Sequence, residues 1–158
     1  MARLYGRAKK GERVNDYVPD VRFERTSVIS TIQLNGKQAP MMFKGTLSGA
    51  AFTTYAKDVL APTLEEGDIV VLDNYASHKV EGALKAIYEK GATVLYLPPY
   101  SPDYNPIEHG WSKMKSELRR IKAKTYDELV AAMKTALDKI SVSDVSGWVK
   151  HCGYIANK

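Results

Sequence analysis

The order of apolar and polar positions predicts that this chain begins its ordered part with a β-hairpin. The β-branched run 26–34 predicts a strand, and Asn35-Gly36 is a strong signal for a tight turn after it. Residues 39–43 then predict the returning strand. Residues 1–24 are polar and rich in arginine and glycine, so we expect a loop or turn that leads into the sheet.

Two further apolar runs predict strands at 69–73 and 93–97, with a helix over about 78–90 between them. Ser77 is the predicted cap of that helix, and Gly91 is predicted to stop it. Because a helix connects the two strands, this part of the sheet is expected to be parallel. The remaining helices are predicted at 48–60, 105–122, 125–140 and 143–151.

A hairpin followed by a crossover unit, with helices covering the sheet, is the order of a ribonuclease-H-like α/β domain. At 158 residues, with 44% hydrophobic and 26% charged residues, we expect one domain over 1–158 that buries a real core. The chain contains no aliphatic run long enough for a membrane-spanning helix and no secretory signal at its start. One cysteine, Cys152, fits a reducing cytoplasm.

Two acidic residues mark the candidate chemistry. Asp73 ends the short apolar run 69–73, and Glu108 comes just after the proline-rich segment 98–106, at the start of a predicted helix. Ligands in open α/β sheets bind beyond the carboxyl ends of the strands. Mg²⁺ prefers carboxylate oxygens, and two such ions can activate a nucleophile and stabilise a leaving oxygen at a phosphodiester.

Each acid also has a purely structural interpretation. Asp73 can hold the turn 73–75, because Asp and Asn favour such positions. Glu108 falls three residues after Asn105, so that Asn105, Pro106 and Glu108 make a capping box. Thr125 and Glu128 show the same pattern at the next helix. Taken singly, each acid is better explained by structure than by catalysis.

The helix that contains Glu108 favours the chemical interpretation. Its apolar positions form one stripe, made of Ile107, Trp111, Met114, Leu118 and Ile121. The neighbouring polar face carries Glu108, Ser112, Lys115 and Arg119, so an acid and two cations share a surface. Residues 113–124 contain six basic residues and one acid, a charge of +5 that equals the net charge of the whole chain. Clustered cations beside metal ligands suggest a polyanionic substrate, although a solvated helix face is the ordinary alternative.

Two motifs carry a resemblance to a known family. They are residues 71–79 (VLDNYASHK) and residues 97–108 (LPPYSPDYNPIE), with 34 residues between Asp73 and Glu108. In these motifs, and in residues 3–7 and 61–64, the chain resembles the catalytic part of DDE-type transposases of the mariner superfamily, in the bacterial insertion-sequence branch. The resemblance implies a ribonuclease-H-like mixed sheet flanked by helices, Mg²⁺ or Mn²⁺ as cofactor, and DNA transposition as the function.

The resemblance also implies roles for individual residues. Asp73 matches the family's second catalytic acid and Glu108 its third, and both are expected to be metal ligands. The expected contacts to DNA are Asn74, His78, Lys113, Lys115, Arg119 and Arg120. For His78 the sequence leaves open whether it touches DNA or only packs beside Asp73.

The chain departs from the family's pattern at its start. The family's first catalytic Asp ends a strand upstream of the segment that residues 3–7 match, so we expect the first strand and the upstream DNA-recognition domain to be missing. None of Asp16, Asp20, Asp58 and Asp68 closes a buried strand, and none is a candidate replacement. We therefore expect weak or no activity from this chain alone, because loss of one member of a catalytic unit removes most of the rate.

Three functions follow as hypotheses. The leading one is a transposase catalytic domain that cleaves and transfers DNA strands at transposon ends and target, as a homodimer or with a full-length or upstream transposase fragment. The second is a non-catalytic DNA-binding or dimerising remnant of a transposase. The third, a nuclease acting on RNA hybrids, is disfavoured by the motif at 97–108. The expected location is the cytoplasm, at the nucleoid.

Overall fold

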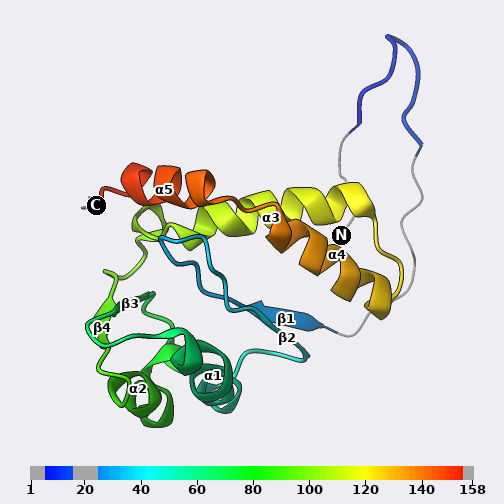
Figure 1. Cartoon of the computed structure of the whole chain (residues 1–158). Coiled ribbons are helices and arrows are strands. Elements are labelled where there is room, and N and C mark those ends of the chain that lie inside the picture. Colours follow the sequence, from blue (N-terminus) through cyan, green and yellow to red (C-terminus); the bar gives the residue numbers. More distant parts are fainter. Residues whose placement is uncertain (1–5, 16–24, 155–158) are drawn as a thin grey trace.

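The computed structural model describes residues 6–15 and 25–154, which form an α/β structure with small sheets between helices. Figure 1 shows the arrangement, with residues 6–15 projecting away from the helices and sheets. The strands are β1 (Thr26–Ile29), β2 (Met41–Lys44), β3 (Ile69–Leu72) and β4 (Thr93–Tyr96). The helices are α1 (Gly49–Tyr55), α2 (Glu81–Tyr88), α3 (Ile107–Ile121), α4 (Tyr126–Asp138) and α5 (Val142–His151).

The predicted strand pairings are confirmed. β1 and β2 are antiparallel, with Ile29 opposite Met41, and the connection turns at Gly36, whose φ of 82° is a conformation that glycine adopts without strain. β3 and β4 are parallel and in register from Ile69 opposite Thr93 to the end of both strands. The single mixed sheet that we predicted is instead two separate two-stranded sheets in the described part of the chain.

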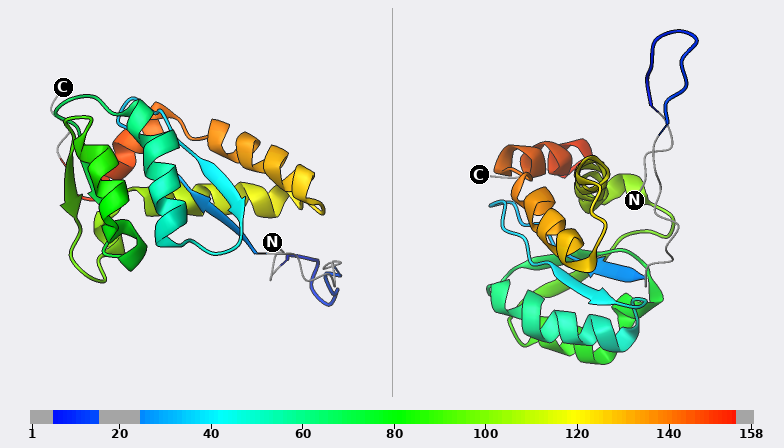
Figure 2. Two further views of the ribbon diagram at one scale, coloured as in Figure 1. Left: turned by 90° about the horizontal axis from the view of Figure 1, so that it is seen from below. Right: turned by 90° about the vertical axis from the view of Figure 1, so that its right-hand side faces the viewer.

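The sheets lie between two helical layers (Figures 1 and 2). Successive side chains of a strand point to opposite faces, and the hairpin uses both faces. On one face, Ile29 packs with Phe52 and Tyr55 of α1 and with Val70 of β3. On the other face, Val28 and Met42 pack on the cluster formed by α3 and α4, whose buried members are Met114, Leu118, Ala132, Met133 and Ala136. The predicted apolar stripe of α3 is thus confirmed as a core contact.

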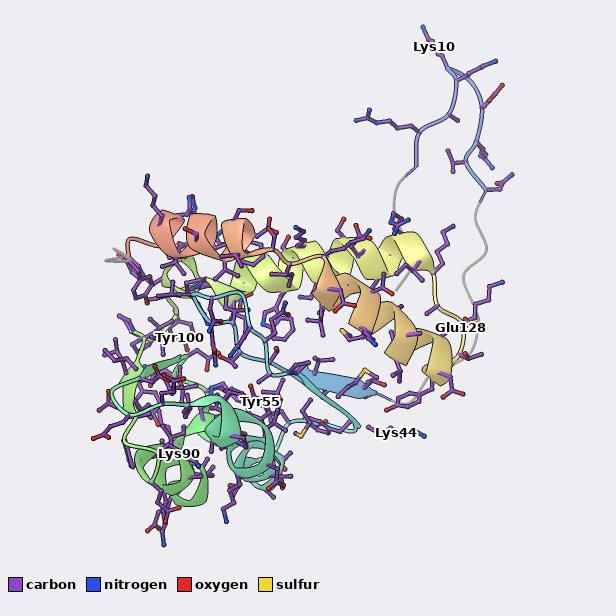
Figure 3. The ribbon with its side chains drawn as sticks, viewed as in Figure 1. Lys10, Lys44, Tyr55, Lys90, Tyr100 and Glu128 are labelled. Atoms are coloured by element: carbon purple, nitrogen blue, oxygen red, sulfur yellow. The ribbon has the colours of Figure 1, made fainter. Side chains whose placement is uncertain are left out.

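The helix α1 is tied to the hairpin by a buried tyrosine. Tyr55 is 2% exposed, and its hydroxyl donates to the carbonyl oxygen of Ala39 over 3.0 Å. Burial raises the pKa of this phenol far above its ordinary value. Figure 3 shows Tyr55 on the inner side of the helical layer, with Lys44 and Lys90 at the periphery.

Several predicted boundaries were wrong. Ser77 does not cap α2, because residues Ala76–Lys79 form a 3₁₀ turn and the helix begins only after Val80. Ser48 does cap α1, but the predicted helix 48–60 continues past Tyr55 as a π-helical segment, Ala56–Leu60, and ends in a 3₁₀ turn that contains Pro62. Gly91, with φ of 72°, ends the α2 region as predicted.

Asp16, Asp20 and most of the matched segment 3–7 lie outside the described residues. Within the described ranges, none of the helices combines the length and the apolar composition needed to cross a bilayer. The fold class that we predicted, an α/β domain of the ribonuclease-H-like kind, is confirmed in its helices, its hairpin and its parallel strand pair.

Candidate metal and nucleic-acid site

Asp73 lies immediately after β3 and at its carboxyl end. The strand is held by Val70, which is buried in the first core cluster, and by the ladder with β4. The apolar run is not buried throughout, because Ile69 at its start is 65% exposed. Asp73 itself follows the last strand residue, Leu72, and its side chain is 50% exposed, so its carboxylate is open to solvent and ligands.

The carboxylate of Asp73 is fixed through one of its two oxygens. Oδ1 accepts a hydrogen bond from the backbone N–H of Tyr75 over 3.0 Å, which confirms that Asp73 holds the turn. The same Oδ1 lies 2.6 Å from Nδ1 of His78, a close contact whose direction is not that of an aligned hydrogen bond. Within the described residues both contacts use Oδ1, so Oδ2 is left for a metal ion.

His78 packs beside Asp73 on the protein side of the site. Its side chain is 15% exposed, and its ring centroid lies 4.5 Å from that of Phe52 and 5.8 Å from that of Tyr75. His78 lies in the 3₁₀ turn Ala76–Lys79. The predicted contact of His78 with DNA stays a prediction, and its packing beside Asp73 is what the structure shows.

Asn74 fixes the neighbouring turn. Its side-chain amide donates to the carbonyl oxygen of Leu97 over 2.7 Å, which ties the end of β3 to the residue after β4. The two strand ends that lead to Asp73 and to the proline-rich segment are therefore held together. The predicted DNA contact of Asn74 also stays a prediction, but its donor group is already committed in the protein.

Glu108 lies in the first turn of α3, where it does not act as a cap. The helix begins at Ile107 with Pro106 in the cap position, and no side-chain cap hydrogen bond is formed there. The capping box that we weighed for Glu108 is therefore wrong. The same sequence pattern at Thr125 and Glu128 does form a capping box, with both reciprocal hydrogen bonds present. Both glutamates are exposed but differ in role: the carboxylate of Glu128 is engaged in the capping box, and that of Glu108 forms no capping bond.

Asp73 and Glu108 line the same cavity, which has a volume of about 800 Å³. His78, Asn105 and Trp111 line it too, so the end of the proline-rich segment, at Asn105 and Pro106, forms part of its wall. Trp111 also packs against the core of α3 and α4. Two acids that lie on different elements, 35 positions apart in the sequence, thus line one cavity.

The residues present fit a hard divalent cation. Both candidate ligands supply carboxylate oxygens, Asn105 beside them carries an amide oxygen, and Mg²⁺ and Mn²⁺ prefer such donors. Asp73 and Glu108 lie on a strand end and a helix, which fixes them more firmly than a loop would. No cluster of three or more His, Cys, Asp or Glu able to hold a metal ion is found in the ranges that the structure describes.

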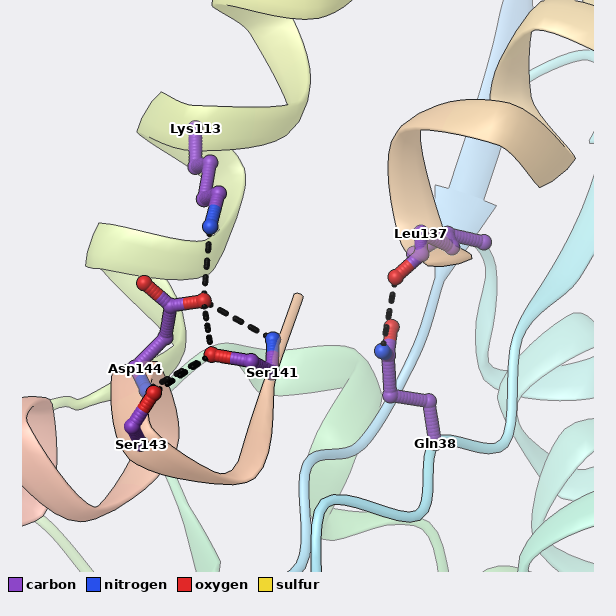
Figure 4. A network of polar contacts seen from close by, with 6 residues as sticks. All are labelled: Gln38, Lys113, Leu137, Ser141, Ser143 and Asp144. Carbon is purple, nitrogen blue, oxygen red and sulfur yellow. Dashed lines mark hydrogen bonds and ion pairs between the residues drawn. The ribbon is translucent and has the colours of Figure 1, made fainter. Parts of the chain in front are cut away.

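Some basic side chains of α3 form ion pairs within the protein, and others are exposed. Nζ of Lys113 lies 2.6 Å from Oδ2 of Asp144 in α5, and the same oxygen accepts hydrogen bonds from Ser141 (Figure 4). Arg120 is paired with Glu117, which also pairs with Lys139. Lys115 and Arg119 are exposed, and we find no ion pair for either among the described residues.

These ion pairs lower the pKa values of the two acids that take part in them. The hydrogen bond from Lys113, followed by those from Ser141, lowers the pKa of Asp144 to about 2. The hydrogen bonds from Lys139 and Arg120 hold the pKa of Glu117 below its ordinary value. The predicted DNA contacts of Lys113 and Arg120 remain untested, and binding DNA would compete with their present partners.

Sequence reasoning missed the contribution of α5. Val145 and Val149 of that helix line the cavity, and Asp144 neutralises Lys113. No motif points to these residues, because they lie more than 30 positions after Glu108 and their place depends on how α5 packs. Asn105 was recognised only as a cap, although its place next to Pro106 in the motif could have marked it as part of the site.

A comparison with protein-family models agrees with this geometry. Residues 1–130 match the model of the DDE superfamily endonucleases, and the chain belongs to that family. A search of curated proteins finds no match to this chain.

Proposed function

We propose that this chain is the catalytic domain of a DNA transposase, in the insertion-sequence branch of the mariner superfamily, that cleaves and transfers DNA strands. The observation that carries the proposal is the shared cavity of Asp73 and Glu108 in a chain of the DDE endonuclease family. The motifs at 71–79 and 97–108 support the choice of branch.

Asp73 and Glu108 would hold Mg²⁺ or Mn²⁺ at the end of β3. When bound, such an ion activates a water or a 3′ hydroxyl and stabilises the leaving oxygen of the phosphodiester. Asp73 would use Oδ2, while His78 and the Tyr75 amide keep Oδ1 in place. Glu108 would approach from α3, where no capping bond holds its side chain.

Double-stranded DNA would lie along the polar face of α3. Lys115 and Arg119 follow Glu108 at helical spacing on this face and are exposed, so the backbone of a DNA that runs along α3 from the metal would pass both. Such contacts release counterions and are sensitive to salt. We further propose that the chain works as one domain at the nucleoid in the cytoplasm, as a homodimer or with a further transposase chain.

We propose low activity for the chain by itself. Among the described residues no group of three or more His, Cys, Asp or Glu could hold a metal ion, and two carboxylates offset less of the charge of a bound cation than three do. The second hypothesis, a DNA-binding remnant without catalysis, predicts the same DNA contacts and no cleavage.

A nicking assay on supercoiled plasmid with Mg²⁺ or Mn²⁺ tests the proposal. We expect slow nicking that is lost in Asp73→Asn and in Glu108→Gln and is kept in Glu65→Gln, a glutamate that lines the same cavity beyond the other end of β3. Nicking that survives in both of the first two variants would overturn the assignment. DNA binding without nicking under any metal would favour the remnant.

A further inference from the structure

We propose that His109 and His151 form a binding site for a divalent transition ion such as Zn²⁺, Ni²⁺ or Cu²⁺, separate from the carboxylate site of Asp73 and Glu108. His109 lies in the first turn of α3, and His151 is the last residue of α5. Their ring centroids are 5.1 Å apart, and the ring planes are nearly perpendicular, at 84°. The two residues are 42 positions apart in the sequence, so the packing of the two helices brings them together.

The spacing of the two rings suits a single bound ion. A zinc ion lies about 2.0–2.1 Å from the nitrogen of a histidine ligand, and so about 3 Å from the ring centroid. With tetrahedral angles at the ion, the centroids of two bound rings are about 5 Å apart, which matches the observed spacing. The rings meet edge to face, so one ring has to turn before a nitrogen of each reaches the ion. His151 is exposed and the χ2 torsion of histidine is broad, so this turn costs little.

Both imidazoles have ring nitrogens that can serve an ion. Within the described ranges neither ring forms a hydrogen bond or an ion pair, and the contacts of the two rings are with each other and with Trp148. His109 is half-buried, and Trp148 stacks on it with the centroids 6.2 Å apart and the planes at 20°. The stack holds the ring of His109 in place, while the exposed His151 can take up an ion from solvent.

Contacts on both sides of the histidine pair fix α5 along the first turns of α3 (Figure 1). On one side, Nζ of Lys113 lies 2.6 Å from Oδ2 of Asp144. On the other side, the hydroxyl of Tyr154 donates to the carbonyl oxygen of Tyr104 over 2.9 Å. The backbones that carry the two ligands are therefore held in place before an ion binds, and binding has to order side chains only.

The donor atoms of this site differ from those of the carboxylate site. Imidazole nitrogens suit Zn²⁺, Ni²⁺ and Cu²⁺, whereas Mg²⁺ prefers oxygen ligands. Neither His109 nor His151 lines the cavity that contains Asp73 and Glu108. Among the described residues no third His, Cys, Asp or Glu completes a metal-binding group, so water fills the remaining positions of the ion. An ion held there would tie α5 to the turn of α3 that also carries Glu108.

Titration of the full chain with Zn²⁺, in an excess of Mg²⁺, tests the proposal without DNA, so its result is independent of the transposase assignment. NMR signals of the imidazole C–H groups report on the ligands directly, and the chain has three histidines. We expect the signals of His109 and His151 to shift together and to saturate at the same Zn²⁺ concentration, in the parent and in Asp73→Asn. A response confined to one of the two rings, or lost in Asp73→Asn, would overturn the proposal.

Substitution of each histidine measures its contribution to Zn²⁺ affinity by isothermal titration calorimetry. His109→Gln and His151→Gln are each expected to bind Zn²⁺ about tenfold or more weakly, because two linked ligands are reduced to one. Lys150→Gln is the matched control, since Lys150 is exposed on the same turn of α5 and its change should leave the affinity as in the parent. His151 is exposed, so His151→Gln carries the test even if His109→Gln does not fold. Unchanged affinity in His151→Gln, or an equal loss in Lys150→Gln, would overturn the proposal.

The thiol of Cys152 is the competing ligand, because it follows His151 directly and sulfur binds the same ions. Cys152 is buried, and we expect Cys152→Ala to bind Zn²⁺ as the parent does. A loss of affinity in Cys152→Ala as large as that in His151→Gln would place the ion at the thiol and overturn the proposal.

Zn²⁺ is also expected to raise the thermal midpoint of the chain. An ion that binds the folded state better than the unfolded state stabilises the fold, and the unfolded chain does not hold two ligands together that are 42 positions apart. The rise should be the same in Lys150→Gln and largely lost in the variant with both histidines changed to Gln. An equal rise in that double variant would contradict a bridge between the two helices.

Discussion

Nδ1 of His78 lies 2.6 Å from Oδ1 of Asp73, and the same ring packs against Phe52 in the core. The ring of His78 therefore connects the carboxylate of Asp73 to the core. The contact is made at Oδ1, the oxygen that also accepts the hydrogen bond from the Tyr75 N–H. Partners of this kind orient a metal ligand and are part of the site even though they do not touch the ion. The motif 71–79 thus supplies both the acid and the residue that positions it.

His78→Phe keeps an aromatic ring next to Phe52 but removes the contact with Asp73. We expect Mn²⁺ affinity, measured by electron paramagnetic resonance of the free ion, to fall about tenfold or more, as is usual for such partners. The thermal midpoint is expected to change little, because the ring still fills its place. An unchanged Mn²⁺ affinity in a folded variant would show that His78 has only a packing role.

Substitutions of Glu108 and of Glu128 can be compared for their effect on the free energy of unfolding, because both residues lie in the first turn of a helix. Glu128→Ala removes half of a capping box, and we expect the free energy of unfolding to drop by about 1 kcal/mol. Glu108→Ala is expected to stay within about 0.5 kcal/mol of the parent, because no capping bond is lost. Urea denaturation of both variants measures the difference. A comparable loss in both would mean that Glu108 is structural after all.

Lys115 and Arg119 are expected to contact DNA phosphates. With both changed to Gln, the slope of the logarithm of DNA affinity against the logarithm of salt concentration should become shallower by about 0.9 for each lost contact. Fluorescence anisotropy over a salt series gives this slope. Lys113→Gln is the control, since Lys113 is held by Asp144 and the slope should not change. If Lys113→Gln alters the slope as much, the pair with Asp144 opens on binding.

Asp144 is expected to make stability depend on pH in the acid range. Its folded pKa of about 2 lies below the ordinary 3.8, so the ionised form stabilises the folded state. This contribution is complete above about pH 4 and is lost as the pH falls through 2. Asp144→Asn should therefore be less stable at pH 7 and show a flatter fall between pH 4 and 2, by urea denaturation at each pH. A parallel fall in both proteins would contradict the role of the pair.

The sequence predicted the strands, turns and helices well, and the boundaries where they connect less well. The turn at Asn35-Gly36, the stripe of α3 and the parallel pairing of 69–73 with 93–97 all follow from short-range patterns, and the structure has each of them. Ser77 does not cap α2, because it lies within the 3₁₀ turn Ala76–Lys79. In this turn His78 contacts Asp73. A capping preference is worth only about 1 kcal/mol and gives way to such tertiary contacts.

In the candidate site, too, local patterns identify residues but not the contacts that depend on packing. Asp73 and Glu108 could be found by residue type, spacing and family resemblance, and the structure brings both to one cavity. Whether Glu108 caps its helix could not be decided from the sequence, because the identical pattern does so at Glu128. The pairing of Lys113 with Asp144 depends on the packing of α5 against α3, which no local pattern contains.

The central claim is that Asp73 and Glu108 bind one divalent cation together. Isothermal titration calorimetry with Mn²⁺ tests it on the parent chain, Asp73→Asn, Glu108→Gln, the double variant and Glu65→Gln as the control. The account predicts that each single change weakens binding about tenfold or more, that the double change adds little, and that Glu65→Gln binds as the parent does. Unchanged Mn²⁺ binding in Asp73→Asn or in Glu108→Gln would contradict it.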